Sequence, residues 1–423
     1  MIKTVNRYSV SQRRRPKFKL ILACFVLLLI AGFVVYKLAF VKHVVTTNKS
    51  SNQTASNKSD TTAPVDSHAN RIRLIATGDF IAHDSVNTAA KQSDGSYNYL
   101  PMMSDFLPVV KQADIRFCND PILNGGSQFG IAGYPKFNSP TAFVTDMGKL
   151  GCNLVNTASN HSFDKTQAAI TASVDAWSSV PNTLAVAGEN RSQAEHDSVH
   201  YFTVKGVKFA FVAYTTYSNN DAPAQNNYGV NIFSQSFASS QIKQAKAAGA
   251  QVIIASMRWG TEYSTVVNAE QKADAQFLAN QGVNLILGHG SHELQTVAKL
   301  QGDSGNSTTV WYSLGNFINT QEPPETLFNG LAILDFDVQS KQLTSMSYLP
   351  IYMHYEWTPA QKAADAIASR HSLHLYPLEN ATQQMIDAQQ LPTTVAAQTA
   401  RINDTLNSSL KIPLVTTQQY FAQ

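Results

Sequence analysis

The chain has 423 residues, of which 43% are hydrophobic and 14% are charged, a composition that excludes a wholly disordered or wholly membrane-embedded protein. The formal net charge of +3 is unevenly spread: residues 1–42 carry nine basic and no acidic side chains, so the remainder has 23 basic and 29 acidic ones. A mildly acidic globular part argues against nucleic acid as the main partner, because neutralising phosphates requires a basic face.

An apolar run near the N-terminus predicts a membrane anchor. Leu20–Phe40 is almost wholly apolar, and a helix of this length spans roughly 30 Å of hydrocarbon. The basic cluster before it predicts a cytoplasmic N-terminus and an extracellular main domain. A cleaved signal peptide is the alternative, but no small-x-small cleavage site follows the run. We therefore expect a cytoplasmic tail over 1–19, a single-pass anchor over 20–41 and a flexible Ser/Thr/Asn-rich linker over 42–70.

Residues 71–355 alternate short apolar runs with helical patterns, which predicts an α/β layered domain with much parallel sheet. Strands are expected at Ile72–Ala76, Ile115–Cys118, Leu154–Ala158, Leu184–Ala187, Tyr201–Val204, Val207–Tyr214, Val252–Ser256, Leu285–Leu287, Val310–Ser313, Leu331–Phe336 and Ser345–Leu349. Helices are expected at Thr141–Leu150, Lys165–Trp177, Ser236–Ala248 and Ala269–Gln281.

The last segment, 356–423, is polar and rich in Ala, Gln and Thr. Helical periodicity occurs around 360–372 and 395–410. We expect a helical C-terminal appendage without visible chemistry.

The three cysteines, Cys24, Cys118 and Cys152, are too few for a disulfide framework. Cys24 falls within the expected anchor. The other two lie in or beside expected strands, so we expect two small buried thiols. A single disulfide between them is the alternative.

Polar side chains follow five of the expected strands at the point where each strand ends. They are Asp79 and His83, Asn119 and Asp120, Asn160 and His161, Arg258, Trp259 and Glu262, and His289 and His292. Each alone could be a turn, a helix cap or a surface residue, and Trp259 a packing residue. Because sites in open α/β sheets form at the carboxyl ends of strands, we expect these side chains to share one pocket. Asp, Asn and His are ligand types for a divalent metal with an open position for water.

The order of these segments resembles the capsule-synthesis CapA family, which includes the poly-γ-glutamate synthesis proteins of Gram-positive bacteria. The resemblance covers roughly 71–350. Its segments are ATGDFIAHDSV, ADIRFCN, YPKFNSP, SNHSFDK, RWGTEY, GVNLILGHGSHELQ and WYSLGNFI. It implies the fold of calcineurin-like metallophosphatases, in which helices flank two stacked sheets.

The resemblance also implies roles for individual residues. His161 would be catalytic and would stabilise charge on a leaving group. The metal ligands or metal-proximal residues would be Asp79, His83, Asn119, Asn160 and His292.

Three positions depart from the family's usual pattern. Pro121 stands where the family's Asn-x-Glu has its carboxylate, Arg258 replaces the histidine of His-Trp-Gly, and Gly290 replaces the first histidine of His-Pro-His. A guanidinium is a permanent cation that repels a dication but can bind a carboxylate or phosphate bidentately. We therefore expect at most one weakly held ion, such as manganese, and a cleft suited to an anionic ligand.

Two neighbouring residues offer substitutes for the missing ligands. Asp120 lies beside Pro121 and His289 beside Gly290, but a shift of one residue on a strand turns a side chain to the opposite face. The predicted ligand-binding residues are Arg258, Trp259, Glu262, Asp120 and His289.

Three functions are compatible with these features. The leading one is a membrane-anchored extracellular component of capsule or poly-γ-glutamate biosynthesis or export, which handles an anionic polymer beside membrane synthase subunits. The first alternative is a metal-dependent phosphoesterase or polymer hydrolase of the cell envelope. The second is a non-catalytic surface binding protein on the same scaffold.

Overall fold

The computed structural model describes residues 70–222 and 227–423. The predicted cytoplasmic tail, the anchor and nearly all of the linker lie outside the described residues, so they stay predictions. Among the described residues, no helix has the length and apolar character needed to cross a membrane.

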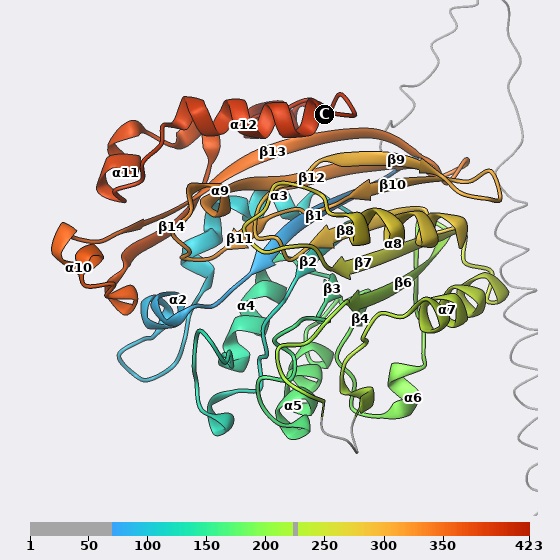
Figure 1. Ribbon diagram of the computed structural model, residues 1–423, viewed down its shortest axis with the longest axis horizontal. Coiled ribbons are helices and arrows are strands. Elements are labelled where there is room, and N and C mark those ends of the chain that lie inside the picture. The colour runs from blue at the N-terminus through green and yellow to red at the C-terminus, as the bar shows by residue number, and fades with distance from the viewer. Residues whose placement is uncertain (1–69, 223–226) are drawn as a thin grey trace, which may run out of the picture. The chain divides into compact units, whose positions relative to one another are not determined.

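Two β-sheets form the centre of the described part (Figure 1). The strands of the first sheet are β1 (Arg71–Phe80), β2 (Ile115–Asn119), β3 (Leu154–Asn156), β4 (Ala185–Ala187), β11 (Asn316–Ile318), β12 (Phe328–Asp337), β13 (Leu343–Glu356) and β14 (His371–Pro377). The strands of the second are β5 (His200–Val204), β6 (Val207–Thr215), β7 (Val252–Arg258), β8 (Leu285–His289), β9 (Val297–Gln301) and β10 (Ser307–Trp311).

The strand order is β14-β13-β12-β1-β2-β3-β4 in the first sheet, with β11 beside β1, and β5-β6-β7-β8-β10-β9 in the second. Strands β1 to β4 pair in parallel, as do β6, β7, β8 and β10. Within each parallel set the carboxyl ends therefore lie along one edge of the sheet.

Helices connect the strands and flank the sheets. They are α2 (Asp84–Ala90), α3 (Leu107–Lys111), α4 (Thr141–Leu150), α5 (Gln167–Ser178), α6 (Gln193–His196), α7 (Gln235–Ala247), α8 (Ala269–Asn280), α9 (Pro324–Leu327), α10 (Pro359–Ala363), α11 (Gln383–Ala388), α12 (Val395–Asn407) and α13 (Thr417–Phe421). A capping box starts α8: the Asn268 side chain accepts from the Gln271 backbone at 2.9 Å, and the Gln271 side chain accepts from the Asn268 backbone at 3.0 Å.

Alternation along β6 explains why the sheets stack. Phe211 points to the first sheet, where its ring lies 6.2 Å from that of Phe117. The next side chain, Val212, belongs to a separate apolar cluster with Ile242 of α7 and Leu278 of α8. Both faces of this sheet are therefore buried, as expected for parallel strands between layers. The predicted α/β arrangement of two sheets flanked by helices is confirmed.

The C-terminal appendage differs from the prediction. Helices α10 to α13 occur in it, but His371–Pro377 forms β14, which pairs antiparallel with β13. The expected helix around 360–372 is reduced to the five residues of α10 and a short 3-10 turn, η4 (Ile367–Ser369). Leu373 and Leu375 alternate with polar residues and are buried, a period-2 pattern that outweighs the polar composition.

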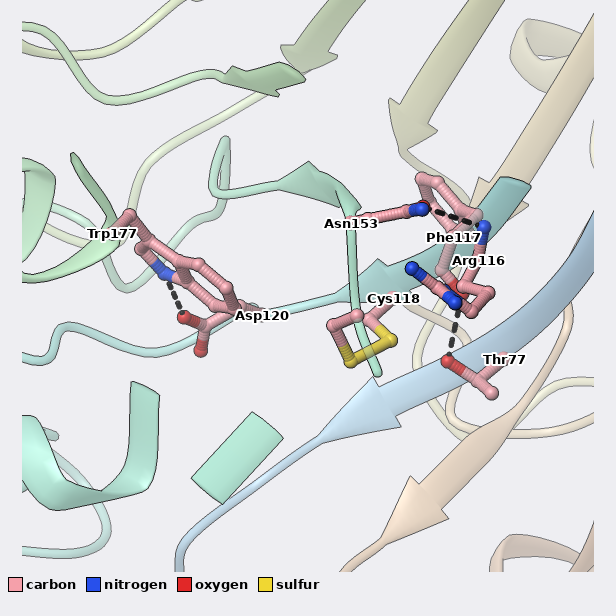
Figure 2. The surroundings of a disulfide bond; sticks show 8 residues. Thr77, Arg116, Phe117, Cys118, Asp120, Asn153 and Trp177 are labelled. Carbon is pink, nitrogen blue, oxygen red and sulfur yellow. Dashed lines mark hydrogen bonds between the residues drawn. A yellow bond between two sulfur atoms is a disulfide. The ribbon is translucent and has the colours of Figure 1, made fainter. Parts of the chain in front are cut away.

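The prediction of two free thiols is wrong. Cys118 in β2 and Cys152, two residues before β3, form a disulfide with a Cα–Cα distance of 5.7 Å (Figure 2). Cys118 is paired in register with Val155, which brings the start of β3 and the preceding residues beside β2. Residue spacing alone does not reveal this register.

Candidate functional site

The carboxyl ends of β1, β2 and β3 form one row of polar side chains. Asp79 is paired in register with Asn119, and Asn119 with Asn156. Asn156 Nδ2 donates to Asn119 Oδ1 at 2.5 Å, and Asn119 Nδ2 donates to Asp79 Oδ1 at 2.6 Å. All three side chains are fully buried. The row fixes the Asp79 carboxylate at the floor of the site.

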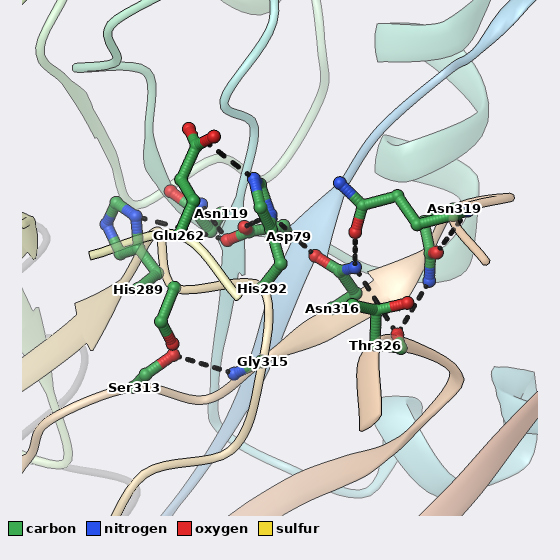
Figure 3. Close-up of polar contacts among 12 residues, drawn as sticks. Asp79, Asn119, Glu262, His289, His292, Ser313, Gly315, Asn316, Asn319 and Thr326 are labelled. Carbon is green, nitrogen blue, oxygen red and sulfur yellow. Dashed lines mark hydrogen bonds and ion pairs between the residues drawn. The ribbon is translucent and has the colours of Figure 1, made fainter. Parts of the chain in front are cut away.

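His292 closes this row from the second sheet (Figure 3). Its Nδ1 lies 3.0 Å from both Asp79 Oδ2 and Asn316 Oδ1, and because both oxygens accept, Nδ1 carries a proton. His292 has φ +64, a left-handed backbone conformation that turns its ring toward β1. The Nε2 atom faces Glu262 Oε1 at 3.8 Å.

The charges in this group shift each other's pKa values. Burial alone would lower the pKa of His292, but its interactions with Asp79 and Glu262 outweigh burial and raise that pKa to about 9. Burial alone would raise the pKa of Asp79, but the hydrogen bond from His292 lowers it. His292 and then Arg258 lower the pKa of Glu262 to about 2.

Arg258 ends β7 and is only 1% exposed. Its Nε donates to Asn160 Oδ1 at 3.0 Å, and its Nη2 donates to Glu262 Oε1 at 2.7 Å. The guanidinium carbon lies 5.2 Å from the centre of the Tyr217 ring. The strand ends of β3 and β7 are thereby joined across the two sheets, as the sequence predicts.

His161 is oriented by a carboxylate behind it. Its Nδ1 lies 2.7 Å from Asp164 Oδ2, and Asp164 also accepts from the Phe137 backbone and from Asn220 Nδ2, each at 2.7 Å. Nδ1 therefore donates, and Nε2 is directed away from Asp164. The ring lines the pocket described next.

A pocket of about 360 Å³ lies beside the network. Its charged lining residues are Asp84, Glu262, Glu322, Asp365, Arg258, Arg370 and protonated His292. Each arginine binds one of the carboxylates, since Arg370 Nη2 donates to Glu322 Oε1 at 2.8 Å. Tyr134, Phe137 and Tyr263 add aromatic surface. The pocket is therefore lined by negatively charged, positively charged and aromatic side chains.

His83 also lines the pocket. Burial, and next the positive charge of His292, lower its pKa to about 3, so the ring is neutral at pH 7. Its Nδ1 accepts from the Thr320 backbone at 3.3 Å.

Three predicted ligand-binding residues lie away from the pocket. Asp120 accepts from Trp177 Nε1 at 2.9 Å (Figure 2). Trp259 donates to the Tyr312 carbonyl at 2.8 Å and is buried under α8. His289 is fully buried, with Nδ1 4.0 Å from Asp79 Oδ1, and burial lowers its pKa to about 3. These three residues are not among those that line the pocket, and whether they bind a ligand stays a prediction.

Comparison with known proteins shows that the part of the chain that forms this site matches a known family. Residues 73–321 match the family described as "Bacterial capsule synthesis protein PGA_cap". The chain belongs to this family. The predicted resemblance to the capsule-synthesis family is confirmed, and every residue of the strand-end network lies within the matched region.

The names of two curated relatives both include CapA. The chain is 26% identical over 218 residues to "PGA biosynthesis protein CapA" of Bacillus subtilis (strain 168), covering 51% of this chain and 55% of that protein. It is 25% identical over 208 residues to "Capsule biosynthesis protein CapA" of Bacillus anthracis, covering 45% and 48%. The match thus spans about half the length of each relative.

Solved structures show a weaker likeness. The 5'-nucleotidase precursor from Thermus thermophilus aligns with 15% identity and a TM-score of 0.40, covering 70% of this chain and 58% of that chain. At this score the likeness carries no argument about chemistry, which rests on the residues themselves.

The residues at the strand ends do not fit a pair of divalent metal ions. Asn160, an expected ligand, has its Oδ1 bound to the permanently charged Arg258. Pro121 and Gly290 supply no donor where the family pattern has one. Across 70–222 and 227–423, no three or more His, Cys, Asp or Glu side chains are grouped to hold a metal ion.

Sequence reasoning missed several residues of the site. Asn156 and Asn316 complete the row at the floor, Asp164 orients His161, and Arg370 reaches the pocket from beyond β13. Asp164 and Asn316 lie inside the segments SNHSFDK and WYSLGNFI, so those segments already contained a signal. Nothing local marks Arg370, because its position depends on the path of the C-terminal segment.

Proposed function

We propose that this protein is a membrane-anchored, extracellular component of capsule or poly-γ-glutamate biosynthesis, and that its pocket binds a carboxylate of an anionic polymer. The observation that carries the proposal is the pairing of Arg258 with Glu262, at 2.7 Å, inside the region that matches the capsule synthesis family. The names of the relatives support the pathway, since both are described as biosynthesis proteins of PGA or capsule.

Glu262 occupies the position that a ligand carboxylate would take. The Arg258 side chain is 1% exposed, whereas that of Glu262 is 38% exposed and lines the pocket. A polymer carboxylate that enters the pocket would replace Glu262 on Nη2 and keep the buried guanidinium paired.

Two features support an extracellular position. The basic cluster before Leu20–Phe40 predicts that residues after the anchor leave the cytoplasm. The disulfide between Cys118 and Cys152 is of a kind that persists in oxidising compartments outside the cytoplasm.

Deletion of the gene tests the pathway. Cell-associated anionic polymer should fall in the deletion strain and return on complementation. An unchanged amount of cell-associated polymer in the deletion strain would refute the proposed role in this pathway.

Binding of poly-γ-glutamate to the detergent-solubilised full-length protein tests the pocket. Glu262→Gln removes the competing charge and should tighten binding roughly threefold or more. Glu270→Gln, on the exposed first turn of α8, is the matched control and should leave binding unchanged. Equal affinities for the wild type and Glu262→Gln would contradict the assignment of the pocket.

A further inference from the structure

Arg258 lies where acceptor groups from several strand ends meet. Asn160 after β3 and Glu262 after β7 both accept from its guanidinium, at 3.0 and 2.7 Å. Arg258 is also paired in register with His289, whose ring lies 4.0 Å from Asp79. An array of oxygens around one buried positive charge is the environment that a bound cation requires. Here the cation is part of the chain.

Gly290 makes room for this side chain. A Cβ at position 290 would lie 2.1 Å from Arg258 Nη1, 2.5 Å from Cδ and 2.6 Å from Cζ, all far inside van der Waals contact. Gly290 also has φ +107, which side chains rarely adopt. Residue 290 must therefore be glycine while Arg258 fills this space. The departures at 258 and 290 are one coupled structural change.

We propose that the Arg258 guanidinium takes the place of a divalent cation, so that the pocket holds its ligand without a metal ion. A guanidinium supplies fixed positive charge and directed donors, which keep Asn160 and Glu262 in position. It offers no open coordination position for water, so the pocket is suited to binding rather than to metal-assisted hydrolysis. The inference concerns the pocket of the proposed function, but its tests need no polymer.

Manganese binding to the detergent-solubilised full-length protein is the first test. At about 0.1 mM Mn²⁺, a concentration on the order of the dissociation constant of a weak metal site, the wild type should bind no Mn²⁺. The ion should also leave its melting temperature unchanged. Arg258→Ala leaves Asn160 and Glu262 without the guanidinium from which they accept, while the Asp79 carboxylate stays at the floor of the site, so Mn²⁺ should raise its melting temperature by about 2 °C or more. Asp79→Ala added to Arg258→Ala should abolish that rise.

The contrary outcome is clear. Stoichiometric Mn²⁺ binding by the wild type that Asp79→Ala removes would overturn the inference. An Arg258→Ala variant that folds and shows no response to Mn²⁺ would also count against it. Neither result bears on whether the pocket binds polymer. If the wild type and Arg258→Ala respond to Mn²⁺ as expected but the wild type does not bind poly-γ-glutamate, only the proposed function is refuted.

A double-mutant cycle tests the coupling of Gly290 to Arg258. Gly290→Ala should lower the melting temperature more than Gly206→Ala, because Gly206 has a similar positive φ, +79, but a Cβ added there would meet nothing within 4 Å. In the Arg258→Ala background the excess loss at Gly290 should disappear. An equal loss in both backgrounds would show that Gly290 is required for another reason and would overturn the coupling.

Discussion

Two buried carboxyl groups, those of Asp120 and Glu189, have no basic partner among the described residues. Burial raises the pKa of Asp120 to about 7, although Trp177 and Asn124 donate to it. Burial raises the pKa of Glu189 well above its usual value of 4.5, and the nearby charge of Asp120 adds to this effect. Ser173 donates to the Glu189 carboxyl group at 2.7 Å. Burial therefore favours the neutral form of the Glu189 carboxyl group.

This environment makes stability depend on pH through Glu189. Because its folded pKa lies above its unfolded value, the contribution is full below about pH 4.5 and is lost as pH rises through the folded pKa. Glu189→Gln keeps the acceptor for Ser173 and cannot ionise. We expect it to be more stable than the wild type at pH 8, by about 1.4 kcal/mol for each pH unit that separates the folded pKa from the unfolded pKa.

Urea unfolding at pH 8 and at pH 4.5 measures this difference. The advantage of Glu189→Gln should vanish at the lower pH, whereas exposed Glu270→Gln should match the wild type at both. A Glu189→Gln variant that loses equal stability at both pH values would indicate that the carboxyl group is needed for its hydrogen bonds alone.

Gly78 controls how closely β1 approaches β11. A Cβ at this position would lie 2.0 Å from the Gly315 carbonyl oxygen and 2.7 Å from its carbon, both backbone atoms that cannot move aside. The same carbonyl accepts from the Asp79 backbone at 3.0 Å. Gly78→Ala should therefore destabilise the protein by about 3 kcal/mol or more. Gly95→Ala meets no atom within 4 Å but has φ +85, so in the same urea titration it measures the cost of backbone strain alone, and Gly78→Ala should lose more stability than it does.

At the scale of elements, the disulfide joins two strands that carry the floor of the site. Cys118 lies one residue before Asn119 in β2, and Cys152 lies just before β3, which ends in Asn156. The bridge closes a loop with a sequence separation of 34 residues. It therefore restrains the unfolded chain and holds β2 beside β3.

Removal of this disulfide should lower the free energy of unfolding by a measurable amount. Cys118→Ala with Cys152→Ala should cost about 2–4 kcal/mol, because the loop regains its freedom in the unfolded state. Dithiothreitol should lower the urea midpoint of the wild type but not of the double variant. The Cys24→Ser variant keeps the pair and should behave as the wild type. Equal midpoints with and without reductant would exclude a stabilising role.

These elements show how far sequence reasoning reaches. Apolar runs bounded by polar residues located β1, β2, β3, β7 and β8, because such runs are buried between layers, but they did not locate β11, which carries Asn316. The alternation in β14 was obscured by its histidines and serine, and β11 has only three residues. The partners of Asp120 and His289 could not be predicted, because they depend on which face each strand end presents.

At the scale of the molecule, the C-terminal segment returns to the first strand of the fold. Arg73 in β1 binds Asp335 of β12 at 2.8 Å and lies over the ring of Tyr420, 5.2 Å from its centre. The Tyr420 hydroxyl donates to the Val109 carbonyl at 3.0 Å, and its side chain is fully buried. Residues outside the region that matches the family therefore complete its core, and Arg370 completes the pocket.

Tyr420→Ala should accordingly destabilise the whole folded unit rather than only the C-terminal segment. Truncating a fully buried aromatic side chain costs about 3–5 kcal/mol, and here it also uncovers the ion pair between Arg73 and Asp335. Tyr420→Phe keeps the ring and removes the hydroxyl, which donates to Val109 and also interacts with Arg73, and this should cost about 1 kcal/mol. Intrinsic fluorescence and circular dichroism followed through the same urea titration should give one coincident transition for each variant. A separate early transition in Tyr420→Ala, with the main one unchanged, would show instead that the C-terminal segment folds apart from the sheets.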